Sequence, residues 1–217
     1  MPEAKAGADT NSYWDERYQA EGRIWGDAPS RTAYHALELF RRHNAKKVLV
    51  PGSGYGRNSR LFATSGFDVT GIEISSVACN LAREFDPLTR LYHASVLDMS
   101  FDTDRYDAIY CFNVLHLFPK KERRLFVQQC LGKVKAGGLM FFTVFSERES
   151  SYGKGRETEP DTFESKPGRP VHYFTEKDLQ EHFQNAEVVE AGLMEDPEDH
   201  GEGPHTHILC YICLRTP

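Results

Sequence analysis

The stretch Val48-Leu49-Val50-Pro51-Gly52-Ser53-Gly54-Tyr55-Gly56-Arg57-Asn58 decides the fold of this chain. An apolar strand runs into a glycine-rich turn, and a helical pattern follows from Asn58 to Ser65. Glycines at such a turn let the backbone bend sharply and let a ligand approach the main chain closely. The stretch therefore predicts a strand–turn–helix unit that binds a ligand.

A second strand, predicted over Asp68 to Ile74, carries Glu73 at its end, 19 residues after Gly54. A carboxylate at that position can accept hydrogen bonds from ribose hydroxyls, so the ligand is expected to contain a nucleoside. The dinucleotide fingerprint is G-x-G-x-x-G, whereas here the third glycine is Gly56 and Arg57 occupies the fingerprint position. A bulky cation there disfavours close packing around a pyrophosphate.

Helical and strand-like segments alternate along the rest of the chain, which is typical of α/β folds. We expect a Rossmann-like α/β fold with a seven-stranded, mostly parallel sheet, an antiparallel last strand and helices on both faces. The pattern predicts further strands at residues 90–94, 106–112, 139–145, 186–192 and 206–214, and helices at 30–43, 76–85 and 120–131. Ser30 should cap the helix at residues 30–43, and a helix capped by Thr175 should follow residue 174.

Two further motifs follow the third and fourth predicted strands, at Ala94–Asp98 and Tyr106–Phe118. Together with the glycine-rich turn and Glu73, they resemble the class I S-adenosylmethionine-dependent methyltransferases. The resemblance implies S-adenosyl-L-methionine as the cofactor, with Asp98 near the adenine amino group and Asn113 near the methionine end. The cofactor-binding residues implied are Trp14, Trp25, Gly52, Ser53, Gly54, Asn58, Glu73, Ile74, Val96, Leu97, Asp98, Asn113 and Val114.

Two branches of the class are similar to this chain. The glycine turn, Gly71–Ser75 and the N-terminal segment Tyr13–Ser30 resemble the thiopurine and thiol methyltransferase-like branch, whereas Gly56–Ser59 resembles the tellurite-resistance branch. Both branches imply a small-molecule acceptor that is a soft nucleophile, such as a thiol or a metalloid or chalcogen oxyanion. An oxygen or nitrogen acceptor on a small metabolite remains the alternative.

The segment Ser146–Tyr173 is rich in glycine, proline, serine and charged residues, and it is long for a connection. It begins at the edge where open α/β sheets bind ligands, so we interpret it as a lid over the substrate site rather than an unstructured surface loop. A hydroxyl or amine acceptor would need a general base. The candidate catalytic residues are His116, His172 and Tyr173.

The chain is expected to form a single domain over residues 1–217, in which residues 1–27 are a tail and a segment that covers the cofactor. The C-x-x-C pair Cys210 and Cys213 should point to opposite faces of a strand, as buried core thiols. We expect no metal site, although His200, His205 and His207 lie close in sequence and the last two would share a strand face. The acidic run Glu195–Asp199 is interpreted as a solvated loop.

Composition limits the remaining possibilities. The 217 residues carry a net charge of −6, so no domain-wide basic field for nucleic acid exists, and no apolar run reaches membrane-spanning length. The expected location is the cytoplasm, and the expected state a monomer or homodimer. An NAD-type oxidoreductase, a non-catalytic nucleoside-binding protein and a nucleic-acid or protein methyltransferase stay open as rival interpretations.

Overall fold

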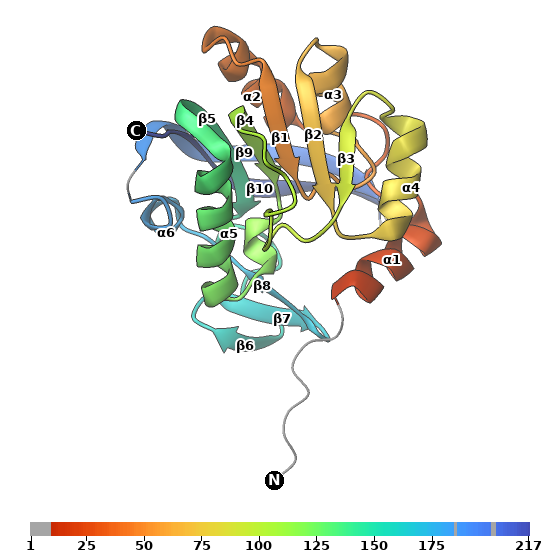
Figure 1. Ribbon diagram of the computed structural model, residues 1–217. Coiled ribbons are helices and arrows are strands. Elements are labelled where there is room, and N and C mark those ends of the chain that lie inside the picture. Colours follow the sequence, from red (N-terminus) through yellow and green to blue (C-terminus); the bar gives the residue numbers. More distant parts are fainter. Residues whose placement is uncertain (1–9, 185, 201–202) are drawn as a thin grey trace.

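The computed structural model describes residues 10–184, 186–200 and 203–217, and within these residues seven strands form one large sheet. Its order is β3-β2-β1-β4-β5-β10-β9 (Figure 1). β1 to β5 pair in parallel, whereas β10 runs antiparallel to both β5 and β9. The Rossmann-like fold with an antiparallel last strand is therefore confirmed. The bounds are β1 Lys47–Pro51, β2 Asp68–Glu73, β3 Arg90–His93, β4 Tyr106–Phe112, β5 Val134–Phe145, β9 Glu187–His200 and β10 Gly203–Arg215.

Helices cover both faces of this sheet, as predicted. One face packs against α5 (Lys120–Lys133) and α6 (Glu176–Glu181), and the other against α2 (Arg31–Arg42) and α3 (Ser59–Thr64). α4 (Ser76–Phe85) lies beside β2 and β3, and α1 (Thr10–Glu21) packs on α4. The caps predicted for α2 and α6 are confirmed, because the Ser30 and Thr175 hydroxyls accept hydrogen bonds from the Ala33 and Asp178 amides.

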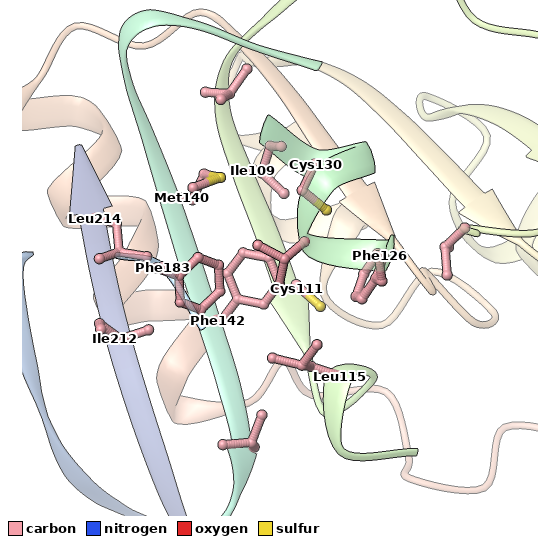
Figure 2. Close-up of a cluster of buried hydrophobic side chains, with 14 of the residues drawn as sticks. Ile109, Cys111, Leu115, Phe126, Cys130, Met140, Phe142, Phe183, Ile212 and Leu214 are labelled. Carbon is pink, nitrogen blue, oxygen red and sulfur yellow. The ribbon is translucent and has the colours of Figure 1, made fainter. Parts of the chain in front are cut away.

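The core of the α5 face is built from aromatic and aliphatic side chains of β4, β5, β10 and α5 (Figure 2). Phe142 on β5 is fully buried and packs edge to face against Phe126 and at a tilt against Phe183. Cys210 belongs to this core, whereas Cys213 belongs to the core on the opposite face. The alternation of β10 thus separates the two sulfurs, and the prediction of buried core thiols is confirmed.

The segment between β5 and α6 contains a second sheet of order β6-β7-β8, where the sequence showed no strand pattern. Its strands are β6 Arg156–Glu159, β7 Thr162–Lys166 and β8 Arg169–His172. A backbone bridge between Ser146 and Phe174 joins the two ends of the segment. Figure 1 shows this small sheet and α1 at the end of the large sheet toward which the arrowheads of β1 and β2 point.

The interpretation of Glu195–Asp199 as a solvated loop is wrong. These residues belong to β9, which pairs with β10 from Glu187 to His200 with one register shift at Cys213/Leu214. Pro197 breaks the expected strand pattern in the sequence, but β9 is the edge strand, where a residue without an amide hydrogen is tolerated. The acidic side chains consequently alternate between two faces, and Asp196 is buried.

The first nine residues of the predicted tail lie outside the described residues. No helix in the described part of the chain combines the length and the apolar character needed to cross a bilayer.

We expect Phe142→Ala to lower the free energy of unfolding by about 3–5 kcal/mol, because it leaves a cavity among rigid aromatic neighbours. Leu88→Ala, at a side chain that is 66% exposed, should change it by less than about 0.5 kcal/mol. Urea unfolding followed by circular dichroism measures both. Equal losses in the two variants would contradict the assignment of Phe142 to the core.

Candidate functional site

The carboxyl ends of β1, β2, β3 and β4 bring the sequence-predicted cofactor residues to one edge of the sheet. β1 has β2 on one side and β4 on the other, so the chain reverses its direction of travel across the sheet between β1 and β4. Open α/β sheets bind ligands at such a switch point. The glycine turn after β1 and Val114 after β4 meet there: a Cβ on Gly52 would lie 2.4 Å from Val114 Cγ2.

Glu73 at the end of β2 bonds to the turn after β1 and to the start of α4. Its carboxylate is 6% exposed and accepts hydrogen bonds from the backbone amides of Gly54 and Ser75, each at 2.8 Å. Burial raises the pKa of Glu73, and the backbone donors act in the opposite direction. Two amide donors leave lone pairs on both carboxylate oxygens, so Glu73 can also accept from the two hydroxyls of a ribose.

The glycines of the turn have backbone conformations that side chains disfavour. Gly52 and Gly54 have φ values of 70° and 58°. A Cβ on Gly54 would lie 2.9 Å from the hydroxyl of Tyr18 on α1. Ser53 between them is turned toward Gly71, and its hydroxyl is buried with no hydrogen-bond partner among the described residues. The turn therefore presents main chain rather than side chains at the edge of the sheet.

The residues after β3 and β4 form the rest of the edge. Val96 is buried, Leu97 and Ile74 are half-buried, and Asp98 is exposed with its carboxylate near the Ser100 amide, which lowers the pKa of Asp98. Asn113 adopts a left-handed conformation (φ 54°) and its side-chain oxygen accepts a hydrogen bond from the Thr143 hydroxyl. This turn directs the chain from β4 into a 3₁₀ turn, η1 (Leu115–Leu117), which carries His116.

Asn58, just past the glycine turn, is buried against the start of α2. Its side-chain oxygen accepts a hydrogen bond from the Ser30 amide and so fixes the start of α2. Sequence reasoning placed Asn58 at the cofactor, and its contacts in the structure are with this helix start.

An aromatic cluster covers the glycine turn. It is formed by Trp14 and Tyr18 of α1 with Trp25 and Tyr55, and the rings of Trp25 and Tyr55 stack with centroids 6.3 Å apart. Asp15 fixes α1 in place because its carboxylate accepts hydrogen bonds from the Ser75 hydroxyl and the Val77 amide at the start of α4. The sequence indicated the tryptophans, but not Asp15, whose partners are 60 residues away.

Two of the three predicted catalytic residues, His116 and Tyr173, lie beside Phe145, where β5 ends. His116 is 2% exposed and stacks on Phe145, with its Nδ1 accepting a hydrogen bond from the Phe145 amide. Burial, reinforced by the positive charge of Arg169, holds the pKa of His116 well below its usual value. His116 is therefore neutral at pH 7 and carries its proton on Nε2.

His172 and Tyr173 are occupied by contacts within the protein. His172 bonds the Thr162 hydroxyl through Nδ1 and Asp178 through Nε2, which joins the small sheet to α6. The Tyr173 hydroxyl donates to Ser151, and burial raises the pKa of Tyr173. Its ring packs beside Phe145 with Tyr152 and Phe163, so it forms part of an aromatic wall.

Arg169 on β8 links the small sheet to α1. Its guanidinium lies over the rings of Tyr13 and Trp14, at 5.1 and 5.2 Å from their centroids, and donates to the Tyr13 hydroxyl. Its Nε is buried and has no hydrogen-bond partner among the described residues. The small sheet and α1 thus meet through a cation whose charge acts on His116.

The segment that forms this edge of the sheet is similar to a known protein family. Residues 48–138, which contain the glycine turn, Glu73 and the segments after β3 and β4, match the family model described as "Methyltransferase domain". Residues 48–138 therefore carry a methyltransferase domain, and the predicted resemblance to the class I S-adenosylmethionine-dependent methyltransferases is confirmed.

Among curated relatives, a ubiquinone biosynthesis O-methyltransferase of Coxiella burnetii is 29% identical over 111 residues. That match covers 49% of this chain and 47% of the relative, so the chain aligns with only about half of the relative's length. Solved structures extend the likeness in fold to almost the whole chain.

Two of those structures illustrate the likeness. One, from a study of the conversion of a disulfide bond into a thioacetal group during echinomycin biosynthesis, has a TM-score of 0.76 at 17% identity, covering 96% of this chain and 92% of that one. TehB from Haemophilus influenzae has a TM-score of 0.65 at 15% identity, covering 94% of this chain and 67% of that one. At these identities the likeness is one of fold.

The close approach of Val114 requires a residue without a side chain at position 52. We expect Gly52→Ala to destabilise the protein by more than Gly22→Ala, because both glycines have φ near 70° but only Gly52 faces Val114 at a distance no Cβ tolerates. Thermal unfolding of the two variants measures the difference. An equal shift in melting temperature would show that the turn does not pack against Val114.

Proposed function

We propose that the protein binds S-adenosyl-L-methionine and methylates a small anionic acceptor with a soft nucleophilic atom, such as a thiolate or a metalloid or chalcogen oxyanion. When bound, the cofactor supplies a methyl group attached to a sulfonium sulfur. The bond from the methyl carbon to that sulfur breaks as the acceptor atom bonds to the methyl carbon. The residues that would hold it are the glycine turn Gly52–Gly54 with Glu73, Asp98 and the Asn113–Val114 turn. Trp14 and Trp25 of the aromatic cover complete the proposed set, and guanidinium groups of Arg17 and Arg169 already lie over these rings.

Arg169 is the observation that carries the choice of an anionic acceptor. A half-buried guanidinium with an unused Nε favours a negative group at this position, because hydrogen bonds to charged partners are the stronger ones. The aromatic wall of Phe145 and Tyr173 beside it favours a polarisable group over a strongly hydrated one. Sulfur chemistry also figures in the echinomycin study whose structure has this fold.

The three titratable candidates support an acceptor that needs no strong base. His116 keeps its Nδ1 on the Phe145 amide, His172 has both nitrogens in hydrogen bonds, and Tyr173 donates to Ser151. None of these side chains has the free, basic atom that deprotonation of an alcohol requires. The chain's contribution is therefore alignment and exclusion of water, and alignment alone is worth roughly 7 kcal/mol or more in well-oriented systems.

An oxygen acceptor is the second candidate. It is favoured by the curated relatives, which are named as O-methyltransferases. The two candidates differ in what the protein must provide, since a phenol or alcohol needs proton removal and a thiolate does not.

We expect purified protein with labelled S-adenosylmethionine to methylate thiols, selenols or reduced metalloid anions in a panel that also contains phenols, alcohols and amines. Arg169→Gln should raise the KM for the anionic acceptor roughly 10- to 100-fold, the loss expected for a charged hydrogen bond. Arg156→Gln, at an exposed arginine of the same small sheet, should leave KM unchanged. Mass spectrometry of the products measures both.

Methylation of a hydroxyl or amine alone would overturn the proposed acceptor class and favour the second candidate. If the protein methylates soft nucleophiles and Arg169→Gln leaves that turnover unchanged, the proposed acceptor class stands and the proposed role of Arg169 is contradicted. The unfolding curve of each variant separates either result from loss of the fold.

A further inference from the structure

The hairpin of β9 and β10 places histidines and carboxylates on one face, close to the site described above. The ladder pairs Glu198 with His205 and Asp196 with His207, and alternation directs all four side chains to the same side. The His205 and His207 Nε2 atoms lie 3.2 Å apart, and Glu198 Oε2 lies 3.6 Å from His207 Nε2. One ligand atom from each of Glu198, His205 and His207 falls within 4.8 Å of the others.

The other ring nitrogens of the two histidines face acceptors. His205 Nδ1 lies 3.0 Å from the Gly203 carbonyl oxygen, and His207 Nδ1 lies 3.2 Å from Glu149 Oε2. Each Nδ1 therefore carries the proton in the neutral ring, and each Nε2 has a lone pair. Two ring nitrogens and a carboxylate oxygen thus converge on one point, where either a proton shared between the Nε2 atoms or a metal cation relieves the repulsion between the lone pairs.

We propose that Glu198, His205 and His207 form a binding site for a divalent transition-metal ion of the zinc type. Bonds of about 2.0–2.1 Å in a tetrahedral arrangement place ligand atoms about 3.3 Å apart, close to the observed 3.2 and 3.6 Å. A set of two imidazoles and one carboxylate is one that zinc and its neighbours prefer, whereas magnesium and calcium prefer oxygen alone.

Each of the three ligands has a partner that orients it, which is a regular feature of metal sites. Glu149 holds His207, the Gly203 carbonyl holds His205, and Arg57 donates to Glu198 Oε1 at 2.8 Å, which leaves Oε2 toward the histidines. The carboxylates of Glu149, Asp196 and Glu198 outnumber the one guanidinium of Arg57, so the region favours a cation. Asp196 Oδ2 is buried and lacks a hydrogen-bond partner among the described residues.

The proposed metal site adjoins the acceptor region. The His207 ring stacks on Phe145 with centroids 4.9 Å apart, and Phe145 in turn stacks on His116. A metal here would join β9 to β10 beside the end of β5. This inference goes beyond the proposed function and does not rest on it, because binding is measured without turnover.

The test uses untagged, full-length protein freed of metal with a chelator. Calorimetric titration with Zn²⁺ should show one ion per chain, and Co²⁺ should give the intense visible absorption of a tetrahedral complex. His205→Gln and His207→Gln should abolish the Co²⁺ band and weaken Zn²⁺ binding at least 100-fold. Glu149→Gln should weaken it roughly 10- to 100-fold, as removal of an orienting partner does.

Two control variants change a histidine and an acidic residue that lie outside the cluster. They are His35→Gln on α2, where the histidine bonds Glu190, and Asp199→Asn on the opposite face of β9. Both should bind Zn²⁺ like the wild type. The absence of one-to-one binding to the wild type would overturn the proposal. Unchanged affinity in both histidine variants would do so as well, with circular dichroism confirming that each variant is folded.

Discussion

The hydrogen bonds from the Gly54 and Ser75 amides to the Glu73 carboxylate are the contacts on which the cofactor edge depends. They join the turn after β1 to the start of α4, across the two neighbouring strands β1 and β2. A buried carboxylate is costly unless donors surround it, so this side chain fixes both turns in the conformation that supplies those donors. Ser75 in turn donates to Asp15, which brings α1 over the edge.

The covering elements come from opposite ends of the chain. α1 precedes the sheet in sequence, and the small sheet β6–β8 is inserted between β5 and α6, yet Arg169 joins them by lying over Tyr13 and Trp14. The β9–β10 hairpin approaches the same region, since Glu198 bonds Arg57 just past the glycine turn. The residues proposed to contact an acceptor therefore lie outside residues 48–138, the segment that matches the methyltransferase domain.

The sequence predicted the core well because its signals are local. The strand–turn–helix around Gly52 and the caps at Ser30 and Thr175 depend on neighbours within a few residues, and Glu73 follows from its fixed spacing of 19 residues after Gly54. The strand bounds of β2 and β4 follow from runs of β-branched and aromatic residues.

The cover and the hairpin could not be predicted in the same way, because their contacts are between distant residues. Tyr13 and Arg169 are 156 residues apart, and Arg57 and Glu198 are 141 apart. Pro197 and the acidic residues around it suggested a loop, and only the pairing with β10 shows that Asp196 and Glu198 alternate in register with His207 and His205. Such pairs carry no signal in one sequence unless the hairpin is assumed beforehand.

The most direct test of the account is calorimetric titration of the purified protein with S-adenosylhomocysteine, with Glu73→Gln and the exposed Glu84→Gln compared in parallel. The account predicts binding in the micromolar range to the wild type and to Glu84→Gln. Glu73→Gln should bind at least roughly 10-fold more weakly, since the amide loses acceptors for the backbone and the ribose. Absence of binding to the wild type, or equal binding by Glu73→Gln with an intact fold, would contradict the assignment of this edge to the cofactor.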